Sequence, residues 1–88
     1  MNTPWGKSDH SEELGDGIVF YYTPSHGGIH VNEKYRHLLP AAAFSECSEF
    51  PWYEEDCDAP IVLHYLWDYL HQSVRNRLHN IRPIGGDL

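Results

Sequence analysis

A loop that combines a nucleophile, a general base and two glycines is the first candidate for chemistry. Ser25 and His26 are followed directly by Gly27 and Gly28. A hydroxyl beside an imidazole suggests nucleophilic catalysis, and the amides of two glycines suggest a cradle for an oxyanion or a phosphate. Catalytic triads are assembled from distant positions, however, and adjacent residues seldom form the nucleophile–base pair. We therefore expect a turn anchored by hydrogen bonds of His26, with a ligand pocket as the alternative.

The second candidate is a run of carboxylates between positions 46 and 58. These acids, with no Lys or Arg among them, are Glu46, Glu49, Glu54, Glu55, Asp56 and Asp58. They can form a solvated surface that caps a helix, a surface that imitates phosphates and docks on a basic groove, or a site for a hard cation. The run lacks the alternation and the glycine of a calcium loop, which disfavours the third interpretation.

Two cysteines and seven histidines complete the reactive side chains. So few cysteines indicate a reducing compartment, so Cys47 and Cys57 are expected to be free thiols, with a disulfide or redox pair as the alternative. Cys57 as a nucleophile is disfavoured because the surrounding acids raise a thiol pKa. The histidines form no compact zinc signature, and we expect no metal, no cofactor and no catalytic residue.

The elements that must position these residues begin with strands. A polar stretch at 7–13 is compatible with an edge strand, and the Asp16-Gly17 pair indicates a tight hairpin turn. The β-branched and aromatic run 18–23 predicts an internal strand covered on both faces. After the loop, residues 29–31 read as a return strand. Residues 32–39 read as a short helix that Asn32 caps and Pro40 ends, which completes a three-stranded antiparallel meander followed by a helix.

A long C-terminal helix is the clearest prediction from periodicity. Asp58 is placed as its N-cap, Pro60 lies in its first turn, and Pro83 ends it. Its apolar stripe consists of Leu63, Leu66, Trp67, Leu70, Val74 and Leu78. The expected fold class is therefore α+β: a small three-stranded antiparallel meander packed against this helix, with one short helix besides. Residues 1–88 are expected to form a single domain with a core at about 3–82 and a tail at 83–88. Residues 41–53 are hard to place: 41–44 could extend a helical turn, and 49–53 reads as extended because of Pro51.

The charge balance restricts the partners. Thirteen acids face six Lys and Arg residues, a formal charge of −7. Such a chain is repelled by nucleic acids and by anionic membranes, and a basic protein surface is its natural electrostatic partner. Neither a signal peptide nor a run of about 18 apolar residues occurs. We therefore expect a cytoplasmic protein that binds neither membranes nor nucleic acid directly.

Three short segments together resemble a known family. They are Thr3-Pro4-Trp5-Gly6, Ser25-His26-Gly27-Gly28-Ile29 and Trp52-Tyr53-Glu54-Glu55-Asp56-Cys57. In this order they are similar to a small uncharacterised domain family of bacteriophages and mobile elements, which occurs alone or within anti-restriction-type proteins. The resemblance covers roughly residues 3–70 and supplies no catalytic residues. It implies a protein that acts in the cytoplasm of a bacterial host cell.

In that context a tiny acidic domain resembles phage-encoded inhibitors of bacterial defence, including CRISPR–Cas inhibitors. We expect a stoichiometric inhibitor that binds a basic nucleic-acid-binding surface of a host defence protein. The expected acidic contacts are Glu49, Glu54, Glu55 and Asp56, with Trp52 and Tyr53 as aromatic anchors.

The alternative is a small enzyme or ligand-binding module. Its pocket would unite Ser25, His26, Gly27 and Gly28 with Cys57 or the acids Glu54–Asp56. An enzyme is the less favoured of the two functions because so short a core seldom preorganises a site. A plain structural subunit remains a third option.

Overall fold

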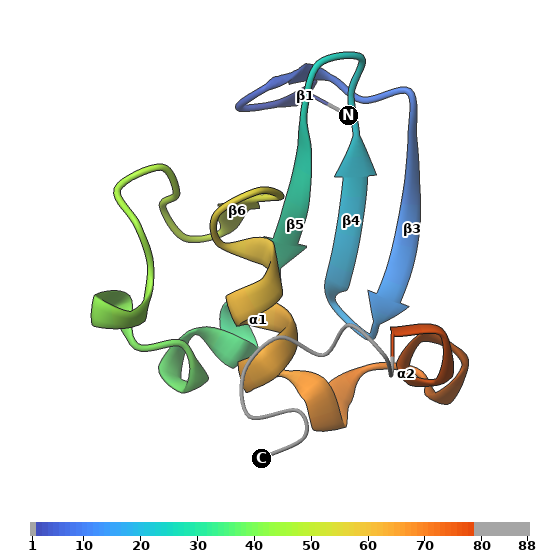
Figure 1. The fold of residues 1–88 in the computed structure, drawn as a ribbon, viewed down its shortest axis with the longest axis vertical. Helices are drawn as coiled ribbons and strands as arrows, with labels where there is room; N and C mark the ends of the chain where they lie inside the picture. The colour runs from blue at the N-terminus through green and yellow to red at the C-terminus, as the bar shows by residue number, and fades with distance from the viewer. Residues whose placement is uncertain (1, 79–88) are drawn as a thin grey trace.

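The computed structural model describes residues 2–78, which form two antiparallel sheets and several short helices (Figure 1). The smaller sheet is the hairpin of β1 (Asn2–Thr3) and β2 (Gly6–Lys7). The larger sheet has the order β3 (His10–Gly15), β4 (Ile18–Tyr22), β5 (Gly27–Val31) and β6 (Trp52–Glu54). The helices are η1 (Glu33–Leu38), η2 (Ala41–Ala43), α1 (Ala59–Tyr65), η3 (Trp67–Tyr69) and α2 (Gln72–Leu78).

Local signals in the sequence account for the first three strands of the larger sheet. The Asp16-Gly17 turn joins β3 to β4, and Gly17 adopts a φ of +84° that favours glycine. Strand β4 pairs with β3 on one side and β5 on the other, as its β-branched and aromatic composition predicted. Strands β3, β4 and β5 are thus antiparallel neighbours in chain order, as part of a four-stranded sheet.

The prediction of a sheet with only three strands, however, is wrong, because the larger sheet has four. Strand β6 pairs with β5, through Ile29 opposite Tyr53 and His30 opposite Trp52, and the hairpin β1–β2 adds a second sheet. Strand β6 has three residues, too few to show a periodicity, and it begins within the stretch 49–53 that reads as extended because of Pro51. Its pairing with β5 depends on contacts between distant parts of the chain.

The prediction of a single long C-terminal helix is also wrong, because the chain bends between α1 and α2. Leu70 has extended backbone angles and forms a β-bridge with Gly15, and the His71 N–H donates to the Leu14 carbonyl at 2.8 Å. Gly15 permits this approach, since a Cβ there would overlap the Tyr69 carbonyl oxygen. Burial of Leu70 at the end of β3 thus outweighs the helical periodicity. The rest of the predicted helix and the predicted tail 83–88 lie outside the described residues.

The two predicted helix caps have different outcomes. Asn32 caps η1 as expected, with its side-chain oxygen accepting the Lys34 N–H at 2.9 Å, although η1 is a 3₁₀ helix. Asp58 occupies the N-cap position of α1, as expected, and its carbonyl accepts the Ile61 and Val62 N–H groups, but its side chain makes no capping hydrogen bond. Its buried carboxylate instead accepts the N–H and the hydroxyl of Ser45, at 2.9 and 2.8 Å. Asp58 therefore joins the segment before β6 to the start of α1.

The core lies on one face of the larger sheet. Ile18, Ile29 and Val31 pack there with Val62 and Leu66, and all five are fully buried. No helix among the described residues is long and apolar enough to cross a membrane.

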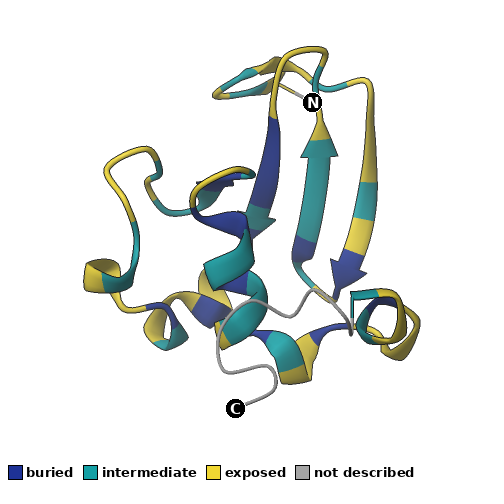
Figure 2. Ribbon diagram, viewed as in Figure 1, coloured by how far each residue is buried: buried dark blue, intermediate teal, exposed yellow. Residues whose placement is uncertain are grey.

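The opposite face of the sheet is only partly covered. It carries Val19, His30 and Trp52, which are cross-strand neighbours of intermediate exposure, together with Tyr21. Most of β4 is of intermediate exposure (Figure 2). The prediction that β4 is covered on both faces thus holds for one face.

Candidate functional site

The three segments that carry the family resemblance meet at one place on the partly covered face. Trp5 packs so closely on Gly28 that a Cβ at Gly28 would overlap the indole ring. The Trp5 and Trp52 rings meet edge to face, with centroids 5.7 Å apart. His26 in turn lies 3.8 Å from Glu54, measured from Nδ1 to Oε2. We call these five residues, Trp5, His26, Gly28, Trp52 and Glu54, the junction.

A tight turn in the hairpin β1–β2 positions Trp5. The Thr3 hydroxyl donates to the Gly6 carbonyl at 2.6 Å and accepts the Trp5 N–H at 3.1 Å. Gly6 has a φ of +117°, which few other residues tolerate. The hairpin lies at one end of the larger sheet, opposite α2 (Figure 1), and Trp5 joins it to β5 and β6.

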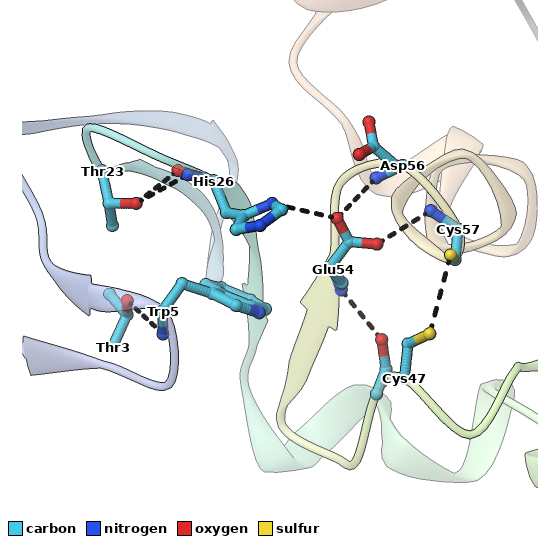
Figure 3. A network of polar contacts seen from close by, with 9 residues as sticks. Thr3, Trp5, Thr23, His26, Cys47, Glu54, Asp56 and Cys57 are labelled. Atoms are coloured by element: carbon cyan, nitrogen blue, oxygen red, sulfur yellow. Dashed lines mark hydrogen bonds and ion pairs between the residues drawn. The ribbon is translucent and has the colours of Figure 1, made fainter.

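The backbone of His26 is fixed while its side chain stays exposed. The His26 N–H donates to the Thr23 hydroxyl at 3.0 Å, and the His26 carbonyl accepts the Thr23 hydroxyl at 2.6 Å and the Thr23 N–H at 2.8 Å (Figure 3). The predicted hydrogen-bonded turn is therefore correct, but backbone groups of His26 make the bonds. Within the described residues, Ser25 has no hydrogen bond to an imidazole, so the loop contains no serine–histidine pair.

Glu54 is the polar centre of the junction. Although its residue is only 8% exposed, its carboxylate accepts the N–H groups of Asp56 and Cys57, both at 3.1 Å (Figure 3). Burial raises the pKa of Glu54, but those two N–H groups and the Cys57 thiol outweigh it, and the pKa lies below its usual value. Glu54 is therefore an ordered carboxylate at neutral pH.

Cys47 and Cys57 lie beside Glu54, on the side away from His26 (Figure 3). Both thiols are free and exposed, with their sulfur atoms 3.7 Å apart. The hydrogen bond with Cys47, followed by the contact with Glu54, raises the pKa of Cys57 to about 11. Cys57 is thus protonated at neutral pH, which argues against the thiolate nucleophile considered from the sequence.

A hollow of about 320 Å³ opens next to the junction. Trp5 and Trp52 contribute aromatic rings to its lining, and Glu46 and Glu49 contribute carboxylates. Its other lining residues are Pro4, Cys47, Ser48 and Phe50. The hollow therefore combines flat apolar surfaces with negative charge.

Of the six residues expected to contact a partner, four are at least partly exposed and two are buried. Glu49 and Trp52 line the hollow, and Asp56 is exposed nearby, with Glu55 partly exposed. Tyr53 and Glu54 are buried, at 5% and 8% exposure, and act inside the domain.

Sequence reasoning named Glu46 only as a member of the acidic run and Trp5 only within its motif, and it did not foresee the hydrogen bonds from Ser45 to Asp58. The segment Thr3-Pro4-Trp5-Gly6 was identified as one of the three motifs. Its contact with Gly28 could not be predicted, because neither segment shows a sequence pattern that indicates it.

The fold and the junction together define a small α+β domain in which three motif-bearing segments share one surface. The chain belongs to the DUF7007 family, a domain of unknown function, whose model matches residues 1–83. This match agrees with the expected small uncharacterised family and extends beyond the segment expected from the motifs. No curated protein and no solved structure matches the chain significantly.

Proposed function

We propose that this domain is a stoichiometric protein-binding module, encoded by a phage or mobile element, that inhibits a bacterial defence protein. In this proposal it acts in the host cytoplasm and covers a basic nucleic-acid-binding surface, such as that of a CRISPR–Cas complex. The observation that supports it is the hollow lined by Trp5, Trp52, Glu46 and Glu49. An arginine or lysine side chain of the partner would enter that hollow.

The chemistry of the hollow suits a basic side chain. A guanidinium group stacks on the faces of tryptophan rings and forms paired hydrogen bonds with carboxylates. Trp5 and Trp52 provide the rings, and their edge-to-face contact at 5.7 Å keeps them in place before a partner arrives. Preorganised aromatic anchors of this kind often contribute most of the binding energy of an interface.

The carboxylates near the hollow are available for such a partner. Several acids elsewhere form ion pairs within the domain, as Asp16 does with Lys34 at 2.6 Å and Glu12 with Arg77 at 2.6 Å. Over residues 2–78, no Lys or Arg forms an ion pair with the four acids that flank β6, namely Glu46, Glu49, Glu55 and Asp56. Their mutual repulsion is relieved when a basic surface approaches.

The test begins with capture of the partner. The tagged domain is incubated with a lysate of the bacterial host at low and at high salt, and bound proteins are identified by mass spectrometry. The recovered partner is then purified, and its affinity is measured for the wild type and for Glu46→Gln/Glu49→Gln. Glu33→Gln/Asp68→Asn is the matched control, because it removes two exposed carboxylates away from the hollow.

The proposal requires a nucleic-acid-binding partner that is held less tightly at high salt. We expect Glu46→Gln/Glu49→Gln to weaken its affinity by about tenfold or more, and the control pair to change it less than about twofold. The domain should also displace nucleic acid from the partner. Failure to recover a stoichiometric partner at either salt, or equal affinities for the two double variants, would rule the proposal out.

A further inference from the structure

The contact between His26 and Glu54 extends to a third side chain. One ligand atom each from His26, Glu54 and Asp56 lie within 4.8 Å of one another. His26 comes from the loop before β5, Glu54 from the end of β6, and Asp56 from the turn before α1. The fold therefore brings an imidazole and two carboxylates to one point from two distant parts of the chain.

One of these groups is rigid, and the other two can adjust. The Glu54 carboxylate is held by the N–H groups of Asp56 and Cys57, and its own N–H donates to the Ser48 hydroxyl at 2.9 Å. Each carboxylate oxygen keeps a second lone pair for another partner. His26 and Asp56 are exposed, so their side chains can rotate toward Glu54.

The spacing lies close to what a metal ion requires. Two ligands of a tetrahedral zinc ion, each about 2.1 Å from the metal, are separated by about 3.4 Å. The His26 and Glu54 ligand atoms are 3.8 Å apart, and none of the three pairs exceeds 4.8 Å. Small side-chain rotations of His26 and Asp56 are enough to bring all three groups into contact with one ion.

The chemistry of the ligand set narrows the choice of ion. Imidazole suits zinc and its transition-metal neighbours, whereas calcium and magnesium prefer oxygen ligands. No Lys or Arg among residues 2–78 neutralises Glu54 or Asp56 through an ion pair. A divalent cation would compensate both charges, and three protein ligands would leave a coordination position for water.

We propose that His26, Glu54 and Asp56 bind one divalent transition-metal ion, with zinc as the best match. The site differs from the hollow proposed to bind a partner, because none of its three ligands lines that hollow. The inference goes beyond the proposed function and does not depend on it. Its test measures metal binding directly and involves no partner protein.

The experiment uses the full chain without a polyhistidine tag. Zinc binding is measured by calorimetry, and cobalt is used in parallel because its visible spectrum reports the coordination geometry and ligand type. His26→Ala and Asp56→Asn remove one ligand each. His37→Ala and Asp68→Asn are matched controls at exposed positions outside the cluster. Cys47→Ser/Cys57→Ser removes the competing thiols, and a thermal melt of each variant confirms that it is folded.

We expect the wild type to bind one zinc ion per chain and to give a tetrahedral cobalt spectrum without a thiolate charge-transfer band. His26→Ala and Asp56→Asn should each weaken binding by about tenfold or more, while the controls and the cysteine double variant retain it. Glu54→Gln is not decisive, since Glu54 also orders two N–H groups and its loss can unfold the turn. The proposal is overturned if the wild type binds no zinc, if His26→Ala and Asp56→Asn bind as tightly as the controls, or if binding disappears with the cysteines.

Discussion

Two buried carboxylates, Glu54 and Asp58, organise the segment that leads into α1. Glu54 accepts the N–H groups of Asp56 and Cys57, whereas Asp58 accepts the N–H and the hydroxyl of Ser45. Burial raises the pKa of Asp58, but hydrogen bonds from Ser45 and Ser48 outweigh it and lower the pKa below the usual value. Both acids therefore act as structural hydrogen-bond acceptors. From the sequence alone they could not be distinguished from the other acids of the run 46–58.

We predict that Asp58→Asn destabilises the fold by about 1–3 kcal/mol at pH 7, because one acceptor oxygen facing Ser45 is replaced by a donor. A folded-state pKa below the unfolded value means that ionised Asp58 stabilises the fold above about pH 4. That contribution is lost as the pH falls through the folded-state pKa. Urea denaturation at neutral and acidic pH measures it: the gap between wild type and Asp58→Asn should narrow in acid. Asp68→Asn, at an exposed position, is the control, and a gap independent of pH would contradict the assignment.

The two thiols beside Glu54 give a second residue-scale prediction. Their sulfur atoms, 3.7 Å apart, need to approach by about 1.7 Å to form a disulfide. With diamide as oxidant, the two thiols lose their hydrogens to its N=N bond, and an S–S bond forms between Cys47 and Cys57. The raised pKa of Cys57 predicts that this reaction accelerates as the pH increases toward about 11.

Thiol titration and the intact mass of the monomer measure the oxidation. We expect both thiols to disappear together in a chain that stays monomeric. Cys47→Ser should keep one reactive thiol and give no intramolecular bond. Oxidation that yields only disulfide-linked dimers would contradict the geometry.

Among the elements, the hairpin β1–β2 has the smallest share of the backbone pairing. It forms a sheet of its own, and Trp5 packs its turn on Gly28 and Trp52. Gly28 is required at that contact because a Cβ would overlap the indole ring and the Tyr53 carbonyl oxygen. The position of the hairpin thus depends on the packing of the large Trp5 side chain against Gly28, which has no side chain.

We predict that Gly28→Ala destabilises the fold by about 1–3 kcal/mol and displaces Trp5, because the added methyl group overpacks the contact. Urea denaturation measures the loss, and a red-shifted tryptophan emission reports the displacement. In a double-mutant cycle, Trp5→Ala should cost less in the Gly28→Ala background than in the wild type. Additive effects would show that Trp5 does not depend on Gly28.

The elements also show which structural signals were local. The Asp16-Gly17 turn and the run from Ile18 to Tyr22 specify their own conformations, and the sequence predicted both correctly. The apolar spacing from Leu63 to Leu78 continues through the bend, so it could not reveal that Leu70 leaves the helix to pair with Gly15.

Sequence patterns could not predict the junction either, because it is formed by contacts between distant positions. Its segments were identified by their motifs, but the packing of Trp5 on Gly28 and the approach of His26 to Glu54 are contacts between positions far apart in the chain.

On the scale of the whole molecule, the formal charge of −7 is the main electrostatic property. Part of it is compensated inside the described residues by ion pairs such as Lys34 with Asp16. Among residues 2–78, no Lys or Arg pairs with the acids that flank β6, so their repulsion acts on the folded state. An excess of like charge destabilises a compact fold and is screened by salt.

We predict that raising NaCl from about 0.02 to about 0.3 M increases the melting temperature at neutral pH, because the shorter Debye length weakens the repulsion. Thermal melts followed by circular dichroism measure the effect. Glu46→Gln/Glu49→Gln should melt higher than the wild type at low salt and respond less to added salt. A melting temperature that falls with salt would indicate that the internal ion pairs contribute more than the repulsion.

The meeting of three distant segments also has a consequence for the order in which the protein matures during synthesis. Trp5 leaves the ribosome before β3, β4 and β5, whereas Trp52 and Glu54 leave after them. The contacts among β3, β4 and β5 are local, since their turns are short, and local contacts form faster than distant ones. Until β6 joins them, Trp5 lacks its aromatic neighbour and His26 lacks its carboxylate. A nascent chain therefore has neither the hollow nor the histidine–carboxylate cluster before Trp52 and Glu54 emerge, so both proposed binding activities begin only when β6 has docked.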